Sequence, residues 1–177
     1  QDQKGSRRQR LAAVMQYCLP GVPCIYYGDE KGMHGFLDPF NRETFQEAPY
    51  DLTKDYRQLA SLRKSADALQ TGHVVFFAPD HDCIGVLRYV VEGRDALGRP
   101  AEDGIYFVAI NRAESERVIV IDFLSRNQLF AEKHQKILRP MFNKTVTCRL
   151  TGKQYTIDEG LLEITLDGLS AVWLKIA

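Results

Sequence analysis

Two adjacent carboxylates near the start of the chain could do chemistry on a polar substrate. Asp29 and Glu30 follow Gly28 and the apolar run Cys24–Tyr27, which reads as a strand covered on both faces. Neighbouring side chains of a strand point to opposite faces, so the two cannot easily flank one bond as paired catalytic carboxylates must. We therefore expect one at the rim of a site and the other in structural hydrogen bonds.

A second charged pair lies a few residues further on, in the long loop of residues 31–49. Pro39 stiffens the turn between Asp38 and Arg42 and should hold the carboxylate near the guanidinium. Such a pair on a loop at a strand's exit could bind the hydroxyl groups of a polyol. The alternative is an exposed ion pair that contributes little. The residues alone leave both interpretations open.

The remaining candidates favour structural roles. His81 and Asp82 precede Cys83, but consecutive residues do not orient as a catalytic triad. Asn143 begins a glycosylation-type triplet that reads as a loop. Trp173 shares a strand face with Ala171 and Lys175 and could be partly exposed for sugar stacking, although packing is favoured.

The histidines, which are His34, His73, His81 and His134, lack metal-ligand spacing, so we expect neither metal nor cofactor.

Composition excludes several classes of partner. The 177 residues carry 23 Lys plus Arg and 23 Asp plus Glu, so no basic field indicates nucleic acid or a membrane surface. No apolar run reaches the roughly 18 residues of a membrane span. The four scattered cysteines favour reduced, buried thiols and hence a cytoplasmic location. The chain begins at Gln1 in mid-pattern, and we interpret it as a fragment.

Hydrophobic periodicity divides the chain near Gly72. Apolar spacing predicts a helix over residues 7–19, capped by Ser6, and a second helix over residues 52–68. From residue 73 onward, β-branched and aromatic runs alternate with turn signals, which predicts an antiparallel β-sandwich. We therefore expect a domain of residues 1–72 and a domain of residues 73–177 that melts independently.

Two segments together resemble a known family. Residues 19–33 (LPGVPCIYYGDEKGM) closely resemble the eighth-strand segment of α-amylase-family glycoside hydrolases. Residues 35–42 (GFLDPFNR) resemble the neopullulanase, cyclomaltodextrinase and maltogenic amylase branch. The match extends from about Ser6 to Ala68. After Arg42 the branch's second basic residue and Pro-Trp pair are absent.

This resemblance implies a mixed fold, the terminal βα portion of a (β/α)8 barrel followed by an all-β antiparallel sandwich. It implies a retaining enzyme whose catalytic carboxylates would all precede Gln1, so none is assigned here. Asp38 and Arg42 match substrate-binding rim positions, and Gly28, Asp29 and Glu30 match the strand-exit motif. The implied substrates are α-1,4- or α-1,6-linked glucans or maltooligosaccharides.

We carry three functional hypotheses. The first is the C-terminal part of such a hydrolase, inactive alone because an N-terminal catalytic part is missing. The second is a carbohydrate-binding or purely structural sandwich. The third is a glucan transglycosylase, which the sequence does not separate from a hydrolase. A second copy of the chain is a further candidate partner, because an unpaired strand at residues 24–27 would need cover.

Overall fold

Helical elements dominate the first seventy residues of the computed structural model, which describes residues 3–33, 35, 37–46, 50–124, 135–136 and 138–177. The α-helices are α1 (Gln3–Cys18), α2 (Thr53–Lys64) and α3 (Asp67–Gln70). The loops contain three short 3-10 helices in the described part of the chain, which are η1 (Asp29–Lys31), η2 (Phe40–Arg42) and η3 (Arg139–Met141).

The predicted helices exist, with shifted ends. Helix α1 begins before Ser6, which is buried inside the helix instead of capping it. The second predicted helix is two helices, because Ala66 takes an extended backbone between α2 and α3. The carboxylate of Asp51 accepts a hydrogen bond from the Thr53 N–H at 2.8 Å, which satisfies a first-turn donor of α2.

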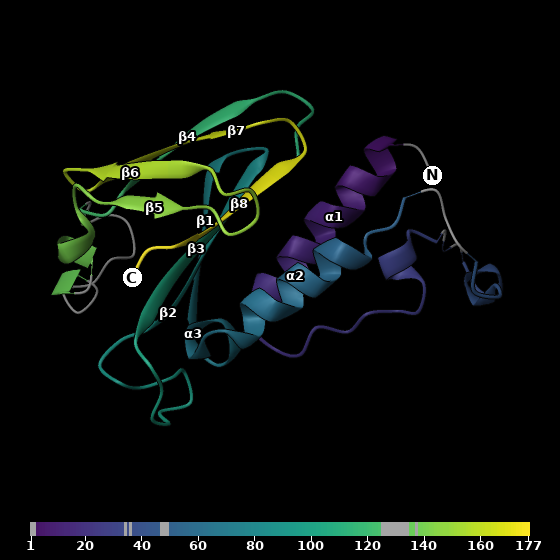
Figure 1. The fold of residues 1–177 in the computed structure, drawn as a ribbon, viewed down its shortest axis with the longest axis horizontal. Helices are drawn as coiled ribbons and strands as arrows, with labels where there is room; N and C mark the ends of the chain where they lie inside the picture. Colours follow the sequence, from purple (N-terminus) through teal and green to yellow (C-terminus); the bar gives the residue numbers. More distant parts are fainter. Residues whose placement is uncertain (1–2, 34, 36, 47–49, 125–134, 137) are drawn as a thin grey trace.

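The strands follow Gly72, as the change of hydrophobic period predicts. They are β1 (His73–Asp80), β2 (Cys83–Val90), β3 (Gly104–Asn111), β4 (Arg117–Asp122), β5 (Thr145–Thr147), β6 (Gln154–Asp158), β7 (Leu161–Leu166) and β8 (Ser170–Lys175). In the described part of the chain they form two antiparallel four-stranded sheets, ordered β1-β2-β3-β8 and β4-β7-β6-β5. Figure 1 shows these sheets face to face, which agrees with the predicted sandwich.

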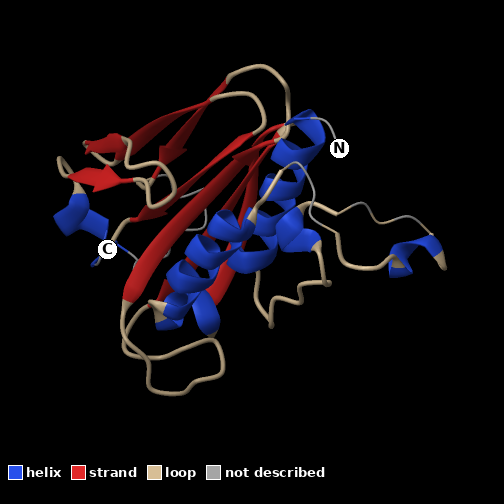
Figure 2. Cartoon of the chain, turned by 45° about the vertical axis from the view of Figure 1, so that its right-hand side comes forward, coloured by secondary structure: helices blue, strands red, loops and turns tan. Residues whose placement is uncertain are grey.

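Side chains that alternate along the strands build two cores. Phe107, Leu162 and Leu174 lie in the core between the sheets. Val86, Val108 and Trp173 point the other way and join Leu59 of α2 in a second core under the helices. Figure 2 shows the helices lying across that face of the first sheet. This shared core favours one cooperative unit over the independent melting expected from the sequence.

One sequence expectation is wrong, and the packing role favoured for Trp173 is confirmed. Cys24–Tyr27 is not a strand: these residues are exposed, and every described strand takes its partners from β1–β8, so none pairs with them. A strand needs a neighbour for its backbone groups, and here none is supplied. Trp173 is fully buried, because α1 and α2 cover the strand face that it shares with Ala171 and Lys175. It therefore cannot stack on a sugar.

Candidate functional site

The loop of residues 37–46, hereafter the rim loop, brings Asp38 and Arg42 together. The Arg42 Nε lies 2.8 Å from the Asp38 Oδ1. Turn hydrogen bonds hold this spacing: the Phe40 N–H donates to the Leu37 carbonyl at 2.9 Å, and the Arg42 N–H donates to the Pro39 carbonyl at 3.1 Å. The Asp38–Pro39 peptide is cis. The proximity expected from the Asp-Pro-x-x-Arg spacing is therefore present.

Both charged side chains of this pair face solvent. Arg42 is 70% exposed and Asp38 is 62% exposed. A pair so exposed is held weakly, by about 0–1 kcal/mol, so a ligand can compete for its groups. The carboxylate can accept from a hydroxyl group, and the guanidinium can donate to one. Chemically, the pair suits recognition of a neutral polyhydroxylated ligand.

Two adjacent tyrosines anchor the rim loop. The Tyr27 hydroxyl donates to the Glu43 carbonyl at 2.8 Å, and the Tyr26 hydroxyl donates to the Asn41 carbonyl at 3.3 Å. Their ring centroids are 4.7 Å apart at an interplanar angle of 43°. The sequence does not predict this role, because the apolar run of residues 24–27 indicates a buried strand. The only signal in the sequence is a pair of hydroxyl-bearing aromatic residues shortly before a long loop.

Gly28 shapes the start of the predicted strand-exit motif. Its φ of 88° lies in the left-handed region, and a Cβ there would collide with the side chain of Met33. The Gly28 carbonyl accepts from the N–H groups of Lys31 and Met33, both at 3.0 Å. Glycine is therefore required for the tight turn that redirects the chain toward the rim loop.

Asp29 and Glu30 lie in η1 and have structural partners. The Asp29 Oδ2 accepts from the Tyr26 N–H at 3.2 Å. Burial raises the pKa of Asp29, while that hydrogen bond lowers it in part. The Glu30 carbonyl accepts from the Leu52 N–H at 2.8 Å, which joins η1 to the start of α2. These contacts do not bring either residue to the Asp38–Arg42 pair.

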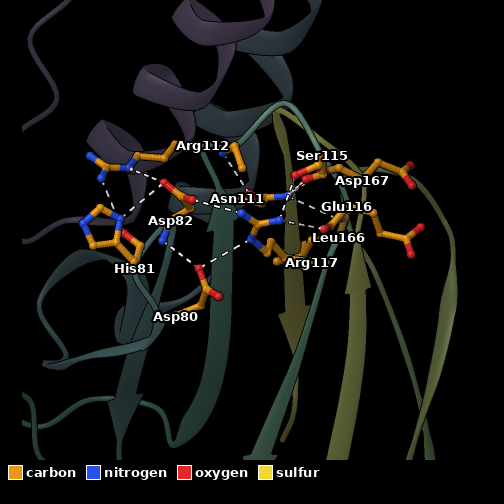
Figure 3. Close-up of polar contacts among 11 residues, drawn as sticks. Asp80, His81, Asp82, Asn111, Arg112, Ser115, Glu116, Arg117, Leu166 and Asp167 are labelled. Carbon is orange, nitrogen blue, oxygen red and sulfur yellow. Dashed lines mark hydrogen bonds and ion pairs between the residues drawn. The ribbon is translucent and has the colours of Figure 1, made fainter.

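The other sequence candidates also have structural surroundings. His81, Asp82 and Arg117 belong to a polar cluster that links the β1–β2 turn to the start of β4 (Figure 3). The Asp82 Oδ2 is 3.1 Å from an Arg117 Nη. Cys83 is buried, and burial is the main cause that raises the pKa of its thiol, which argues against a reactive thiolate. The Asn143 side chain accepts from the Glu159 N–H at 3.1 Å and orders a turn.

A large cavity lies away from this pair. It has a volume of about 910 Å³, and its lining includes Pro20, Val22, Arg63, His73 and Leu97. Neither Asp38 nor Arg42 lines this cavity, so the volume of the cavity does not mark the position of the charged pair.

The described side chains include no group of three or more His, Cys, Asp or Glu placed to hold a metal ion. In the same part of the chain, no helix has the length and apolar character to cross a bilayer. His34 and His134, which the sequence analysis considered, lie outside the described residues.

Comparisons with known proteins place this geometry in context. No family model matches the chain. An amylopullulanase from Thermoanaerobacterium thermosulfurigenes is 31% identical over 175 residues, which covers 94% of this chain and 9% of that protein. A cyclomaltodextrinase from Geobacillus thermopakistaniensis is 35% identical over 95 residues, which covers 51% of this chain and 16% of that protein.

A solved structure matches the fold over almost the whole chain. The α-amylase from Geobacillus thermoleovorans, complexed with acarbose, superposes with a TM-score of 0.74 at 22% identity, covering 98% of this chain and 34% of that one. The chain spans 9–12% of the length of the amylopullulanases it matches. Its relatives are glycoside hydrolases of the α-amylase family, which confirms the resemblance carried by residues 6–68.

Proposed function

We propose that this chain is the C-terminal part of a retaining α-amylase-family enzyme. In that role it supplies a substrate rim and an accessory sandwich, and the catalytic carboxylates lie in an N-terminal part. The substrates are α-1,4- or α-1,6-linked glucans or maltooligosaccharides. The observation that carries this proposal is the exposed Asp38–Arg42 pair, on a loop anchored by two tyrosines, in a chain whose relatives include amylopullulanase and cyclomaltodextrinase.

The chemistry of the pair fits the substrate class. A glucose unit presents hydroxyl groups that both donate and accept, and the pair offers one charged acceptor beside a charged donor. Hydrogen bonds to charged groups contribute about 1.5–3 kcal/mol. Tyr26 is about half exposed beside the rim loop and adds an aromatic ring on which a sugar face can pack.

A hydrolysis assay tests the first half of the proposal. The 177-residue chain incubated with maltooligosaccharides should release no product, because it holds only the rim. Measurable turnover would overturn the assignment of the catalytic carboxylates to another part of the protein.

A binding titration tests the second half. Maltoheptaose titrated into the chain by calorimetry should bind weakly, and both Asp38→Ala and Arg42→Ala should raise the Kd about tenfold, which corresponds to about 1.4 kcal/mol. Asp158→Ala is the matched control, since Asp158 is an exposed carboxylate on β6. Equal affinity of the wild type and the rim variants would contradict a rim role.

The accessory sandwich is proposed as a support and not as a sugar-binding module. Its single tryptophan, Trp173, is fully buried. A cytoplasmic, reducing location also remains our proposal, supported by free thiols at all four cysteines. Cys18, Cys83 and Cys148 are buried as expected, whereas Cys24 is exposed.

A further inference from the structure

A buried arginine reaches from the sandwich into the helical layer. Arg88 lies on β2, is fully buried, and points toward the helices. Its Nη1 donates to the Cys18 carbonyl at 2.8 Å, its Nη2 donates to the Gly72 carbonyl at 3.1 Å, and its Nε donates to the His73 carbonyl at 3.3 Å. A buried charge is costly unless it is hydrogen-bonded, so these three contacts must compensate for its desolvation.

A second arginine meets the same end of α1. Arg63, in the last turn of α2, is 8% exposed. Its Nη1 donates to the carbonyls of Tyr17 and Leu19, at 2.7 and 2.8 Å, and its Nη2 donates to the Gly21 carbonyl. Together the two guanidinium groups satisfy carbonyls in and just after the last turn of α1.

Electrostatics favours this arrangement. The last turn of a helix presents unpaired carbonyls and a partial negative charge, which a cation stabilises. Burial, followed by repulsion from the positive charge of Arg63, lowers the pKa of Arg88 to about 10, so the group still carries its charge at neutral pH. The two arginines therefore act as a C-terminal cap for α1 that comes from α2 and β2.

The capped helix in turn holds residues 20–30, hereafter the exit segment. The Gln16 side chain donates to the Cys24 carbonyl, and the Gln9 side chain donates to the Asp29 carbonyl at 2.7 Å. Both glutamines belong to α1, so the exit segment is tied to that helix at two points. Beyond them, the tyrosines of the exit segment hold the rim loop through the Glu43 and Asn41 carbonyls.

The sandwich also holds the other end of α1. Glu114, between β3 and β4, forms ion pairs with Lys4 and with Arg8, the latter at 3.3 Å. The Arg7 guanidinium donates to the Gly168 carbonyl in the turn before β8. Helix α1 is thus fixed at both ends by turns and strands of the sandwich.

We propose that Arg88, with Arg63, is a positioning residue for the substrate rim. By fixing the point where the chain leaves α1, it sets the course of the exit segment and, through the two tyrosines, the placement of the Asp38–Arg42 pair. This inference rests on the proposed function for the meaning of the rim. The coupling between β2 and the rim loop can be measured in the chain without any ligand.

Native-state amide exchange on the 177-residue chain tests the coupling. In Arg88→Met, the amides of Asp29, Met33 and Arg42, all hydrogen-bonded in or near the exit segment and rim loop, should exchange about tenfold faster. Arg88→Lys keeps a charged donor and should recover part of the protection. If Arg88→Met does not fold, Arg63→Met provides the same test from α2.

The matched control separates positioning from general stability. Ile164→Val removes one buried methylene from β7, away from α1, and lowers stability without touching either arginine. It should leave the exchange of the Asp29 and Arg42 amides unchanged. Equal acceleration of these amides by Ile164→Val, or none in either arginine variant, would overturn the proposal. A chain that shows the coupling but binds no maltoheptaose would instead refute the proposed function alone.

Discussion

Truncation of Leu59 tests whether the helices and the sandwich fold as one unit. Leu59 lies on α2, is 1% exposed, and belongs to the core under the helices that also contains Val86 of β2 and Trp173 of β8. Leu→Ala at such a position removes buried methylenes and leaves a cavity, at a cost of about 2–5 kcal/mol. For a chain of this size, about 3 kcal/mol lowers the Tm by roughly 6–12 °C.

The assay is urea unfolding followed by two probes. Trp173 is the single tryptophan, so its fluorescence reports the core between the helices and the first sheet. Far-ultraviolet circular dichroism reports the helices and both sheets. We expect one transition in the wild type and one transition at lower urea in Leu59→Ala, with both probes coincident.

A leucine on the opposite surface provides the control. Leu161 on β7 is 47% exposed, so Leu161→Ala makes the same chemical change and should alter stability by no more than about 0.5 kcal/mol. Two separate transitions, of which Leu59→Ala lowers only the helical one, would refute the shared-core reasoning. That result would support the independent sandwich expected from the sequence.

Three further predictions follow from buried or hydrogen-bonded polar groups. Asn111 is fully buried and its amide donates to three backbone carbonyls, so Asn111→Ala should cost about 1–3 kcal/mol in urea unfolding. Burial raises the pKa of Asp95, but hydrogen bonds led by that from the Arg99 N–H outweigh it and lower the pKa to about 2. Stability should therefore be lost as the pH falls from about 4 toward 2, and Asp95→Asn should flatten that part of the pH profile. Burial raises the pKa of Asp29, so ionisation of its carboxyl destabilises the fold as the pH rises above the unfolded pKa. In urea unfolding, Asp29→Asn should therefore lose less stability than the wild type between pH 3 and pH 7.

The strands were largely predictable because their residues carry strong local signals. Ile105–Ile110 and Leu161–Leu166 are rich in β-branched and apolar residues between turn residues, and these runs lie in β3 and β7. Strand β5 carries no such signal. It has three residues, Thr145–Thr147, of which only Val146 is buried, and so short an element has no readable period.

Burial was harder to predict, because it depends on what covers each face. The alternation of Trp173 with Val172 and Leu174 is as expected, but the face of Trp173 is covered by helices that lie over a hundred residues earlier in the chain. Cys24–Tyr27 shows the reverse effect. Its composition favours a buried strand, yet it has no strand neighbour in the described residues and is exposed. Local sequence sets propensity, whereas distant elements decide burial.

The site was predictable where spacing alone determines it. Asp38 and Arg42 are four residues apart around a proline, and a turn at that spacing brings their side chains together. The support for the rim loop was not predictable, because Tyr27 and the Glu43 carbonyl are 16 residues apart. Arg88 is 70 residues from the Cys18 carbonyl that it contacts. Neither partner leaves a local pattern in the sequence.

The two aspartates near the rim show how surroundings divide the roles of identical side chains. The carboxylate of Asp29 accepts from the Tyr26 N–H, and burial raises its pKa, so binding a ligand there would break a structural contact. Asp38 is 62% exposed and pairs with the exposed side chain of Arg42, which a ligand can displace at little cost. Under the proposed function, a sugar hydroxyl would therefore gain more from Asp38 than from Asp29. The proposal therefore places ligand recognition in the rim loop, whereas the Asp29 carboxylate holds the turn that leads to it.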